Sequence, residues 1–225
     1  MARDIKTVNS RRIKSIANAQ TTEPIREEKD ILNLLNHMLK KYEKAKTDVK
    51  KYQAYRNYMI IYIGLNTAFR AEDLLQLRVK DINNGYVHIQ ENKTRKVQNY
   101  KLDNRLKEDI QEYIRMFDLS PSEYLFLGQK RKEDGKPYNY PITRQMAYKM
   151  ISKAGEEMGF GFVFGVHSLR KTYGYRFIKN GGKLTTLMAM FNHSNPIVTM
   201  RYVMWRETDV TKDRQSFYIG VRGKK

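Results

Sequence analysis

The spacing of hydrophobic residues predicts two long helices at the start of the chain. The first begins after Pro24, because proline and acidic residues are typical of a first helical turn. Its apolar positions recur at helical spacing, at Ile31, Leu34, Leu35, Met38 and Leu39. A second helix, which Asp48 can cap, is almost wholly apolar over residues 58–65 and is therefore expected to lie in the core.

The middle of the chain has the pattern of short strands. Strand-like runs cover residues 79–82, 86–89 and 97–102, and Asn83, Asn84 and Gly85 have the composition of a tight turn between the first two. The third run returns after a polar, basic turn of sequence ENKTRK. This pattern predicts a three-stranded antiparallel sheet.

Further helices are expected after the sheet. Asp103 can cap a helix that ends before Ser120, and Thr143 can start another. The apolar positions of that second helix follow at intervals of four, at Met146, Met150, Ala154 and Met158. Three alternating phenylalanines, Phe160, Phe162 and Phe164, are interpreted as core residues. The fold class is therefore mainly α with a small antiparallel three-stranded sheet, an α+β protein.

Composition narrows the class of partner. The 225 residues include 43 Lys and Arg against 24 Asp and Glu, which gives a formal charge of +19. Such an excess indicates a polyanion as partner, for which a nucleic acid and a membrane surface compete. The sequence contains no apolar run long enough to span a membrane and no signal-peptide pattern, so neither a membrane partner nor export is expected. The absence of cysteine fits a cytoplasmic protein.

Residues able to handle a phosphate ester gather late in the chain. His167 and Arg170 are three positions apart, so both lie on one helix face, and His193 and Tyr202 follow. Arg70 begins an earlier helix that packs into the protein. Such an arginine needs an anion, either a neighbouring carboxylate such as Asp73 or the phosphate of a ligand.

These residues resemble the catalytic residues of the tyrosine recombinase (phage integrase) family. HSLR resembles its H-x-x-R motif, RY its nucleophile motif, and NTAFRAEDL its T-G-L-R-x-x-E-L segment. Asn192 stands where the family usually has glycine before the second histidine, and Ala68 replaces another usual glycine. The resemblance covers about residues 24–202 and implies the tyrosine recombinase catalytic-domain fold.

The resemblance also implies a role for each residue. Arg70 and Arg170 would bind the non-bridging oxygens of the phosphate, and Tyr202 would attack phosphorus to form a 3′-phosphotyrosine link. His167 would accept the phenolic proton, His193 would donate a hydrogen bond, and Asp73 would support Arg70. The general acid would be Lys93 on the hairpin, with Lys96 as the alternative. One ester replaces another, so neither a metal nor ATP is expected.

The expected organisation is a basic arm over residues 1–22, a catalytic domain over residues 23–206 and a basic tail over residues 207–225. Residues expected to contact DNA are Arg11, Arg12, Lys96, Lys149 and Lys153. The family resemblance implies a homotetramer on double-stranded DNA recombination sites, association with the nucleoid and, as possible further partners, accessory DNA-bending or core-binding proteins.

Two other functions remain open at this stage. A type IB topoisomerase would use the same chemistry to relax supercoils, and a catalytically silent DNA-binding regulator would show the same charge. The target sequence, and the choice between integration, excision and inversion, are not encoded in any recognisable motif.

Overall fold

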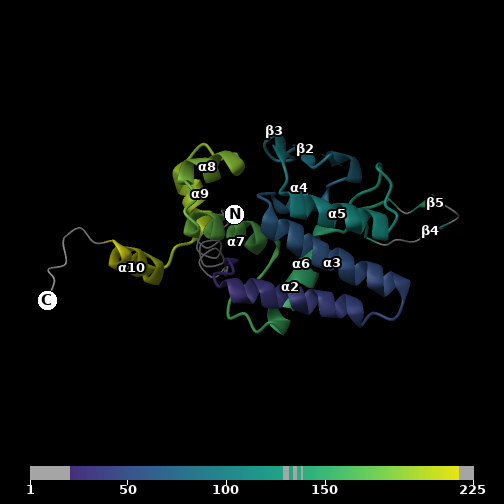
Figure 1. Cartoon of the computed structure of the whole chain (residues 1–225), viewed down its shortest axis with the longest axis horizontal. Coiled ribbons are helices and arrows are strands. Elements are labelled where there is room, and N and C mark those ends of the chain that lie inside the picture. Colours follow the sequence, from purple (N-terminus) through teal and green to yellow (C-terminus); the bar gives the residue numbers. More distant parts are fainter. Residues whose placement is uncertain (1–20, 129–131, 134–135, 138, 218–225) are drawn as a thin grey trace, which may run out of the picture.

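The computed structural model describes residues 21–128, 132–133, 136–137 and 139–217 (Figure 1). Helices dominate this part of the chain, as predicted. They are α2 (Glu28–Glu43), α3 (Asp48–Asn66), α4 (Ala71–Leu75), α5 (Asn104–Met116), α6 (Arg144–Glu157), α7 (Val166–Lys179), α8 (Leu184–Met190), α9 (Pro196–Val203) and α10 (Glu207–Ser216). None of the helices in the described ranges is long and apolar enough to cross a membrane.

The predicted three-stranded antiparallel sheet is present, in the order β1-β2-β3. Its strands are β1 (Ile82–Asn83), β2 (Tyr86–Gln90) and β3 (Val97–Lys101), and a separate two-stranded ribbon joins β4 (Lys132–Glu133) to β5 (Lys136–Pro137). Asn84 and Gly85 both have positive φ, at 51° and 82°, as a two-residue hairpin turn between β1 and β2 requires.

The prediction of a strand over residues 79–82 is mostly wrong. Val79–Asp81 forms a 3-10 helix, η1, and β1 begins only at Ile82. The Asp81 carboxylate accepts a hydrogen bond from the Arg78 backbone N–H at 2.8 Å, which tightens this turn. The backbone N–H groups of Val79 and Lys80 donate to the carbonyls of Glu123 and Pro121, so this segment pairs with a loop instead of a strand.

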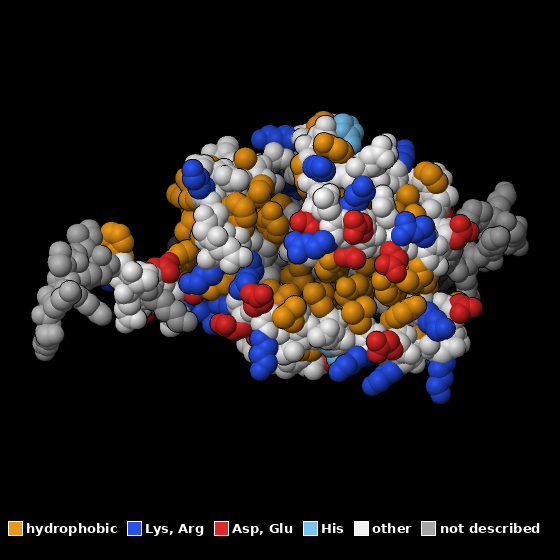
Figure 2. Space-filling view, viewed as in Figure 1, with side chains coloured by type: hydrophobic (Ala, Val, Ile, Leu, Met, Phe, Trp, Pro, Cys, Tyr) orange, Lys and Arg blue, Asp and Glu red, His pale blue; other side chains and the backbone are white. Residues whose placement is uncertain are grey.

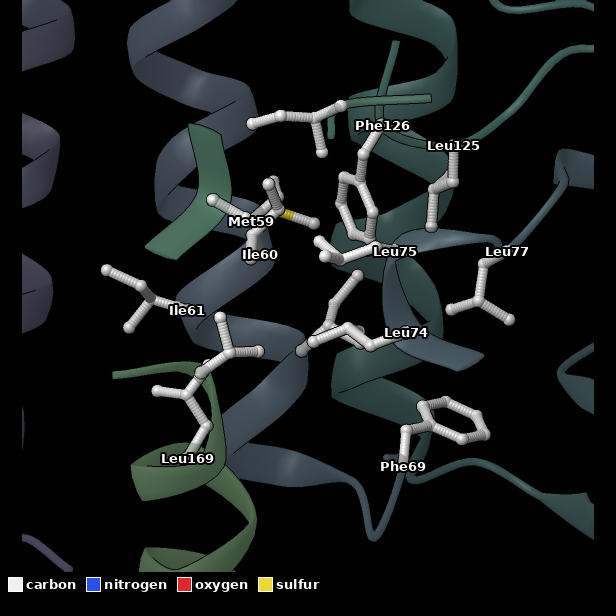
Figure 3. Close-up of a cluster of buried hydrophobic side chains, with 14 of the residues drawn as sticks. Met59, Ile60, Ile61, Phe69, Leu74, Leu75, Leu77, Leu125, Phe126 and Leu169 are labelled. Carbon is white, nitrogen blue, oxygen red and sulfur yellow. The ribbon is translucent and has the colours of Figure 1, made fainter. Parts of the chain in front are cut away.

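Helix α3 is the centre of the main core, as its apolar run predicted. Met59, Ile60 and Ile61 are fully buried, and α4 and the segment around Phe126 lie on one side of α3 while Ile61 points to the other (Figure 3). Leu169 of α7 packs beside them in the same cluster. The helix that carries His167 and Arg170 is thus fixed directly against the central helix.

Two of the three predicted N-cap residues are confirmed, and the third cap lies one residue earlier than predicted. Asp103 and Thr143 accept hydrogen bonds from first-turn N–H groups of α5 and α6, as predicted. Thr47, and not Asp48, caps α3, because its hydroxyl accepts from the Lys50 N–H while Asp48 is already helical.

The predicted apolar face of α6 is confirmed in part. Ala154 is fully buried, and Met150 and Met158 are partly buried against the core, but Met146 is 46% exposed. The other fully buried residues of this helix are Ala147 and Ile151, and the small alanine side chains allow α6 to lie close to the core.

A second, smaller core lies beneath α8 and α9. Leu187, Phe191 and Val203 are fully buried there, together with Tyr175 and Ala68. Beyond it, α10 extends away from the rest of the molecule (Figure 1). Its first turn is attached by the Tyr175 hydroxyl, which donates to Asp209 at 2.9 Å.

The surface combines charge with an apolar band. In the view of Figure 2, hydrophobic side chains form a band between α2 and the elements above it, with basic groups spread along the edges. Tyr55, Tyr58 and Tyr62 of α3 are partly buried, and consecutive rings in this series lie 5.5 Å apart. Tyr55 stacks on Tyr113 of α5, and the Tyr62 hydroxyl donates to Asp109 of the same helix, so these tyrosines lie between α3 and α5.

Candidate active site

The two predicted arginines converge on one backbone oxygen. The Nη2 atoms of Arg70 and Arg170 donate to the carbonyl oxygen of Phe191, at 3.2 and 3.0 Å. Arg170 is only 2% exposed, and its Nη1 donates to the carbonyl of Ala68. The loop before α4, helix α7 and the end of α8 therefore meet at this point.

The electrostatics of the arginine pair favour an anion. Burial and the neighbouring Arg70 charge lower the pKa of Arg170 to about 10. Arg170 remains charged at neutral pH, so two guanidinium groups stay close together. A phosphate between or beside them would relieve this repulsion and would accept paired hydrogen bonds.

Tyr202 lies beside the arginine pair on α9. Its ring centroid is 5.2 Å from that of Phe191 and 5.3 Å from that of His193, and the Arg170 guanidinium carbon lies 5.4 Å from it. Asn195 caps this short helix and Pro196 occupies its first turn, which fixes where α9 begins. The helix start thus places the phenol within the positively charged region.

His193 is held in a defined orientation. Its Nδ1 hydrogen-bonds to the Thr199 hydroxyl at 3.0 Å, which leaves Nε2 available for a ligand. Burial and the charges of Arg170 and Arg70 lower its pKa to about 4. His193 is therefore neutral at physiological pH.

His167 lies at the exposed start of α7, one turn before Arg170. Its pKa is lowered, first by partial desolvation against the protein surface and then by the positive charges of Arg144, Lys171 and Arg170. A neutral imidazole at this position can accept a proton.

The hairpin between β2 and β3 carries Lys93 and is fixed at its base. The Asp73 carboxylate accepts hydrogen bonds from the Asn92 backbone N–H at 2.9 Å and from its side-chain amide at 3.2 Å. Lys93 and Lys96 are both exposed in the hairpin loop. Asp73 therefore supports the hairpin. Burial raises the pKa of its carboxyl, and the positive charge of Arg70 also acts on this group, by lowering the pKa.

The anion that pairs with Arg70 is Glu91. Its Oε2 lies 2.5 Å from Arg70 Nη1, and the Glu91 side chain is fully buried. The carboxylate also accepts hydrogen bonds from the Thr94 hydroxyl and the Gln98 side-chain amide, and the Asn192 side chain contributes to the lowering of its pKa. Burial alone would raise the pKa of Glu91, but these donors and Arg70 lower it to about 2.

Of the residues expected to contact DNA, the structure describes Lys96, Lys149 and Lys153. Lys149 and Lys153 are exposed on α6, and Lys96 is exposed on the hairpin. Arg11 and Arg12 lie outside the described residues. The structure thus brings Arg70, Arg170, His193 and Tyr202 into one site, with His167 and the hairpin of Lys93 at its edge.

Sequence reasoning missed Glu91, Phe191 and Thr199. A signal for Glu91 was present, because Val87 and Ile89 are alternate residues of β2 that face the core and the same period continues to Glu91. Phe191 acts through its carbonyl and its ring, which no motif specifies. Thr199 had no signal beyond its position on α9.

Comparison with known proteins now identifies the family. Residues 19–208 match the profile of the Phage integrase family. The chain belongs to this family. It is 34% identical over 160 residues to the probable integrase/recombinase YoeC of Bacillus subtilis (strain 168), and this match covers 69% of the chain and 83% of YoeC.

Two more distant relatives extend the comparison. Tyrosine recombinase XerD of Staphylococcus aureus (strain Mu50 / ATCC 700699) is 24% identical over 178 residues, which cover 76% of this chain and 57% of XerD. A structure of the XerH site-specific recombinase, a post-cleavage complex bound to palindromic difH substrate, superposes with a TM-score of 0.64 at 18% identity. That match covers 88% of this chain and 53% of XerH.

These findings confirm the predicted family, the fold class and the enzyme class of a site-specific tyrosine recombinase. The chain spans little more than half the length of XerD and XerH, and most of the length of YoeC. The roles of single residues rest on the geometry of the site.

Proposed function

We propose that this chain cleaves and rejoins DNA strands at specific sites through a 3′-phosphotyrosine intermediate. The observation that carries the proposal is the convergence of Arg70 and Arg170 on the Phe191 carbonyl, next to the ring of Tyr202. Two fixed guanidinium groups beside a phenol supply both a phosphate site and a nucleophile.

In the proposed cleavage step, the Tyr202 oxygen attacks the phosphorus of a phosphodiester. The new bond joins the phenolic oxygen to phosphorus, and the bond from phosphorus to the 5′ oxygen breaks. Negative charge on the non-bridging oxygens grows in the transition state, where Arg70 and Arg170 stabilise it. Removing one such donor typically costs about 3 kcal/mol of transition-state stabilisation.

Protons are balanced within the site. His167 accepts the phenolic proton of Tyr202, Lys93 gives a proton to the departing 5′ oxygen, and His193 donates a hydrogen bond from Nε2 to the phosphate. Religation reverses these steps, with the 5′ hydroxyl as the attacking group. The ester bond is conserved throughout, so the reaction has no need of ATP.

The lysine assignment can be tested with the leaving group. In a substrate with sulfur at the bridging 5′ position, the thiolate leaves without a proton. If Lys93 is the general acid, Lys93→Ala slows cleavage of normal DNA about 100-fold but cleaves the sulfur substrate at close to the wild-type rate. Lys96→Ala is the matched control, and rescue of that variant instead would assign the role to Lys96.

The proposed partner is double-stranded DNA, supported by the formal charge of +19 and by the similarity to a recombinase, XerH, whose structure is bound to its difH substrate. Residues Lys96, Lys149 and Lys153 would contact its phosphates, with Arg11 and Arg12 in an arm over residues 1–22. Each copy of the chain would have a catalytic domain over residues 23–206 and a tail over residues 207–225. Four copies would assemble as a tetramer on paired sites. Accessory DNA-bending or core-binding proteins would complete site recognition in the cytoplasm, on the nucleoid.

A plasmid assay tests the function as a whole. Duplexes that bind the protein are first enriched from random sequence, and two copies of the enriched site are placed in one supercoiled plasmid. The proposal predicts deletion or inversion of the DNA between the sites, and no rearrangement with Tyr202→Phe.

Two results would contradict the proposal. Relaxation of supercoils without rearrangement, from a plasmid with one site or none, would indicate a topoisomerase. Tight, salt-sensitive binding without any covalent or rearranged product would indicate a DNA-binding regulator.

A further inference from the structure

Glu91 lies at the centre of a buried polar network that joins three parts of the site. We define the Glu91 network as Arg70, Glu91, Thr94, Gln98 and Asn192. Arg70 begins α4, Thr94 and Gln98 belong to the hairpin of Lys93, and Asn192 precedes His193. Three segments distant in sequence are thus connected through one carboxylate.

The contacts of Glu91 with Arg70 and with the hairpin have a defined geometry. Glu91 Oε2 lies 2.5 Å from Arg70 Nη1, and Glu91 Oε1 accepts from Gln98 Nε2 at 2.5 Å. Thr94 donates its hydroxyl to the same carboxylate, which closes the turn around Lys93. The Glu91 backbone also accepts from the Arg95 N–H at 2.9 Å, so its main chain and side chain both hold the loop.

Asn192 has two functions in this arrangement. Its backbone has a positive φ of 53°, a conformation that asparagine tolerates better than most residues other than glycine. Its side-chain amide faces the Glu91 carboxylate closely enough to contribute to the lowering of the pKa of that group. Glycine at this position would allow the same backbone turn but could not make the side-chain contact.

We propose that Glu91 is a positioning residue, which with Asn192 fixes Arg70, the Lys93 hairpin and the His193 turn in the arrangement needed for strand cleavage. This inference rests on the proposed function. Glu91 is fully buried and touches catalytic groups only through Arg70 and the loop backbone, so it orients these groups and takes no part in proton transfer.

The burial of Glu91 makes its charge important. Replacing the carboxylate by an amide keeps the shape but removes the charge that holds Arg70. The glutamine side chain would also place its NH₂ group opposite other hydrogen-bond donors, such as Arg70 and Asn192. Two donors cannot hydrogen-bond to each other, so contacts that the carboxylate makes would be lost. The hairpin would then sample other positions, and the groups that depend on it would lose their alignment.

The test measures cleavage and binding separately in Glu91→Gln. The substrate is a nicked duplex of the enriched site, from which the cleaved fragment diffuses away, so that the rate of covalent adduct formation is recorded. We expect this rate to fall at least about tenfold, with DNA affinity within about twofold of wild type. A faster reaction or tighter binding would overturn the proposal, because Glu91 would then compete with the phosphate for Arg70.

Asn192→Gly and the double variant test the connection between the two residues. The glycine keeps the backbone conformation and removes only the amide, so we expect a slower adduct rate of about threefold or more. If Asn192 acts through Glu91, the double variant is no slower than Glu91→Gln alone. Fully multiplicative losses would mean that the two residues act independently, and the proposal would fail.

A DNA-free measurement separates this inference from the proposed function. Backbone hydrogen exchange over residues 90–97 should accelerate in both variants, while exchange in α3 remains unchanged. If wild type forms no adduct on any DNA but the hairpin still loosens, the proposed function fails and the structural role stands. If wild type forms adducts and both variants match it in rate and exchange, the inference is wrong.

Discussion

Arg170 keeps a charged guanidinium almost wholly out of water. Two backbone carbonyls accept its hydrogen bonds, and the Phe191 ring lies 4.0 Å from its guanidinium carbon. Neutral carbonyls and an aromatic face compensate only part of the cost of burying a charge. The remaining need for an anion is what suits this side chain to a phosphate.

Arg170→Lys should therefore abolish most cleavage while the protein remains folded. The ammonium keeps the charge but cannot bind two carbonyls and a phosphate at fixed angles, so the adduct rate should fall by about 100-fold or more. Arg176→Lys is the control, because Arg176 is on the same helix but pairs with Glu28 at the surface. A cleavage rate within threefold of wild type would show that Arg170 is structural.

His193 should make stability depend on pH. Its folded-state pKa of about 4 lies below the usual value of 6.5, so the unfolded chain binds the proton more strongly between these values. The stabilising contribution is complete above pH 6.5 and is lost as the pH falls toward 4. Urea unfolding at several pH values should show that the free energy of unfolding falls less steeply from pH 6.5 to pH 4 in His193→Gln than in wild type.

The control for that experiment is His88→Gln, since His88 is an exposed position on β2. If the free energy of unfolding depends equally on pH in wild type and His193→Gln between pH 6.5 and 4, the folded protein does not hold the His193 imidazole in its neutral form.

At the scale of elements, the site depends on how α7 crosses α3. Gly64 lies at this crossing, and a Cβ there would come within 2.6 Å of the Leu169 side chain and 3.1 Å of that of Leu74. The absence of a side chain allows the two helices to approach closely. This close approach sets the position of α7, and therefore of His167 and Arg170, relative to Arg70 at the start of α4.

Gly64→Ala should destabilise the protein in spite of the better helix propensity of alanine. Overpacking of this kind costs about 1–3 kcal/mol, measured as a lower midpoint in urea unfolding. Gly161→Ala is the matched control, because a Cβ at Gly161 meets no atom within 4 Å. If Gly64→Ala proved as stable as that control, the crossing would not be tightly packed.

The elements differ in how far sequence could predict them. The hydrophobic pattern was enough to predict α3 and β2. A helix that is buried on most sides leaves a continuous apolar run, and a strand that is buried on one face leaves alternating apolar residues. The pattern failed for Val79–Asp81, where a local carboxylate and pairing with a loop produced a 3-10 turn from strand-forming residues. On α6 it failed only at Met146, which is exposed, while Ala147 one position later is fully buried.

The site itself was predictable where motifs specify side chains. Arg70, Arg170, His193 and Tyr202 meet in the structure as the sequence implied. The Glu91 pairing was not predictable, because choosing between Asp73 and Glu91 as the partner of Arg70 requires three-dimensional positions. Backbone groups such as the Phe191 carbonyl leave no trace in a residue pattern.

At the scale of the whole molecule, the formal charge of +19 and the site act together. A strongly basic protein associates with DNA through phosphates without regard to sequence, and binding of this kind weakens steeply with salt. In the proposed mechanism, the geometry of the site then selects one phosphate among many. The chain covers 57% of the length of XerD, so site recognition in such relatives can involve segments that have no counterpart in the aligned region.

Identification of the nucleophile tests the central claim most directly. Wild type and Tyr202→Phe are each incubated with a nicked duplex of the enriched site, and covalent products are digested and sequenced by mass spectrometry. The account predicts a nucleotide attached through its 3′ phosphate to Tyr202 in wild type, and no adduct in Tyr202→Phe. An adduct on another tyrosine, or an equal yield from the variant, would contradict it.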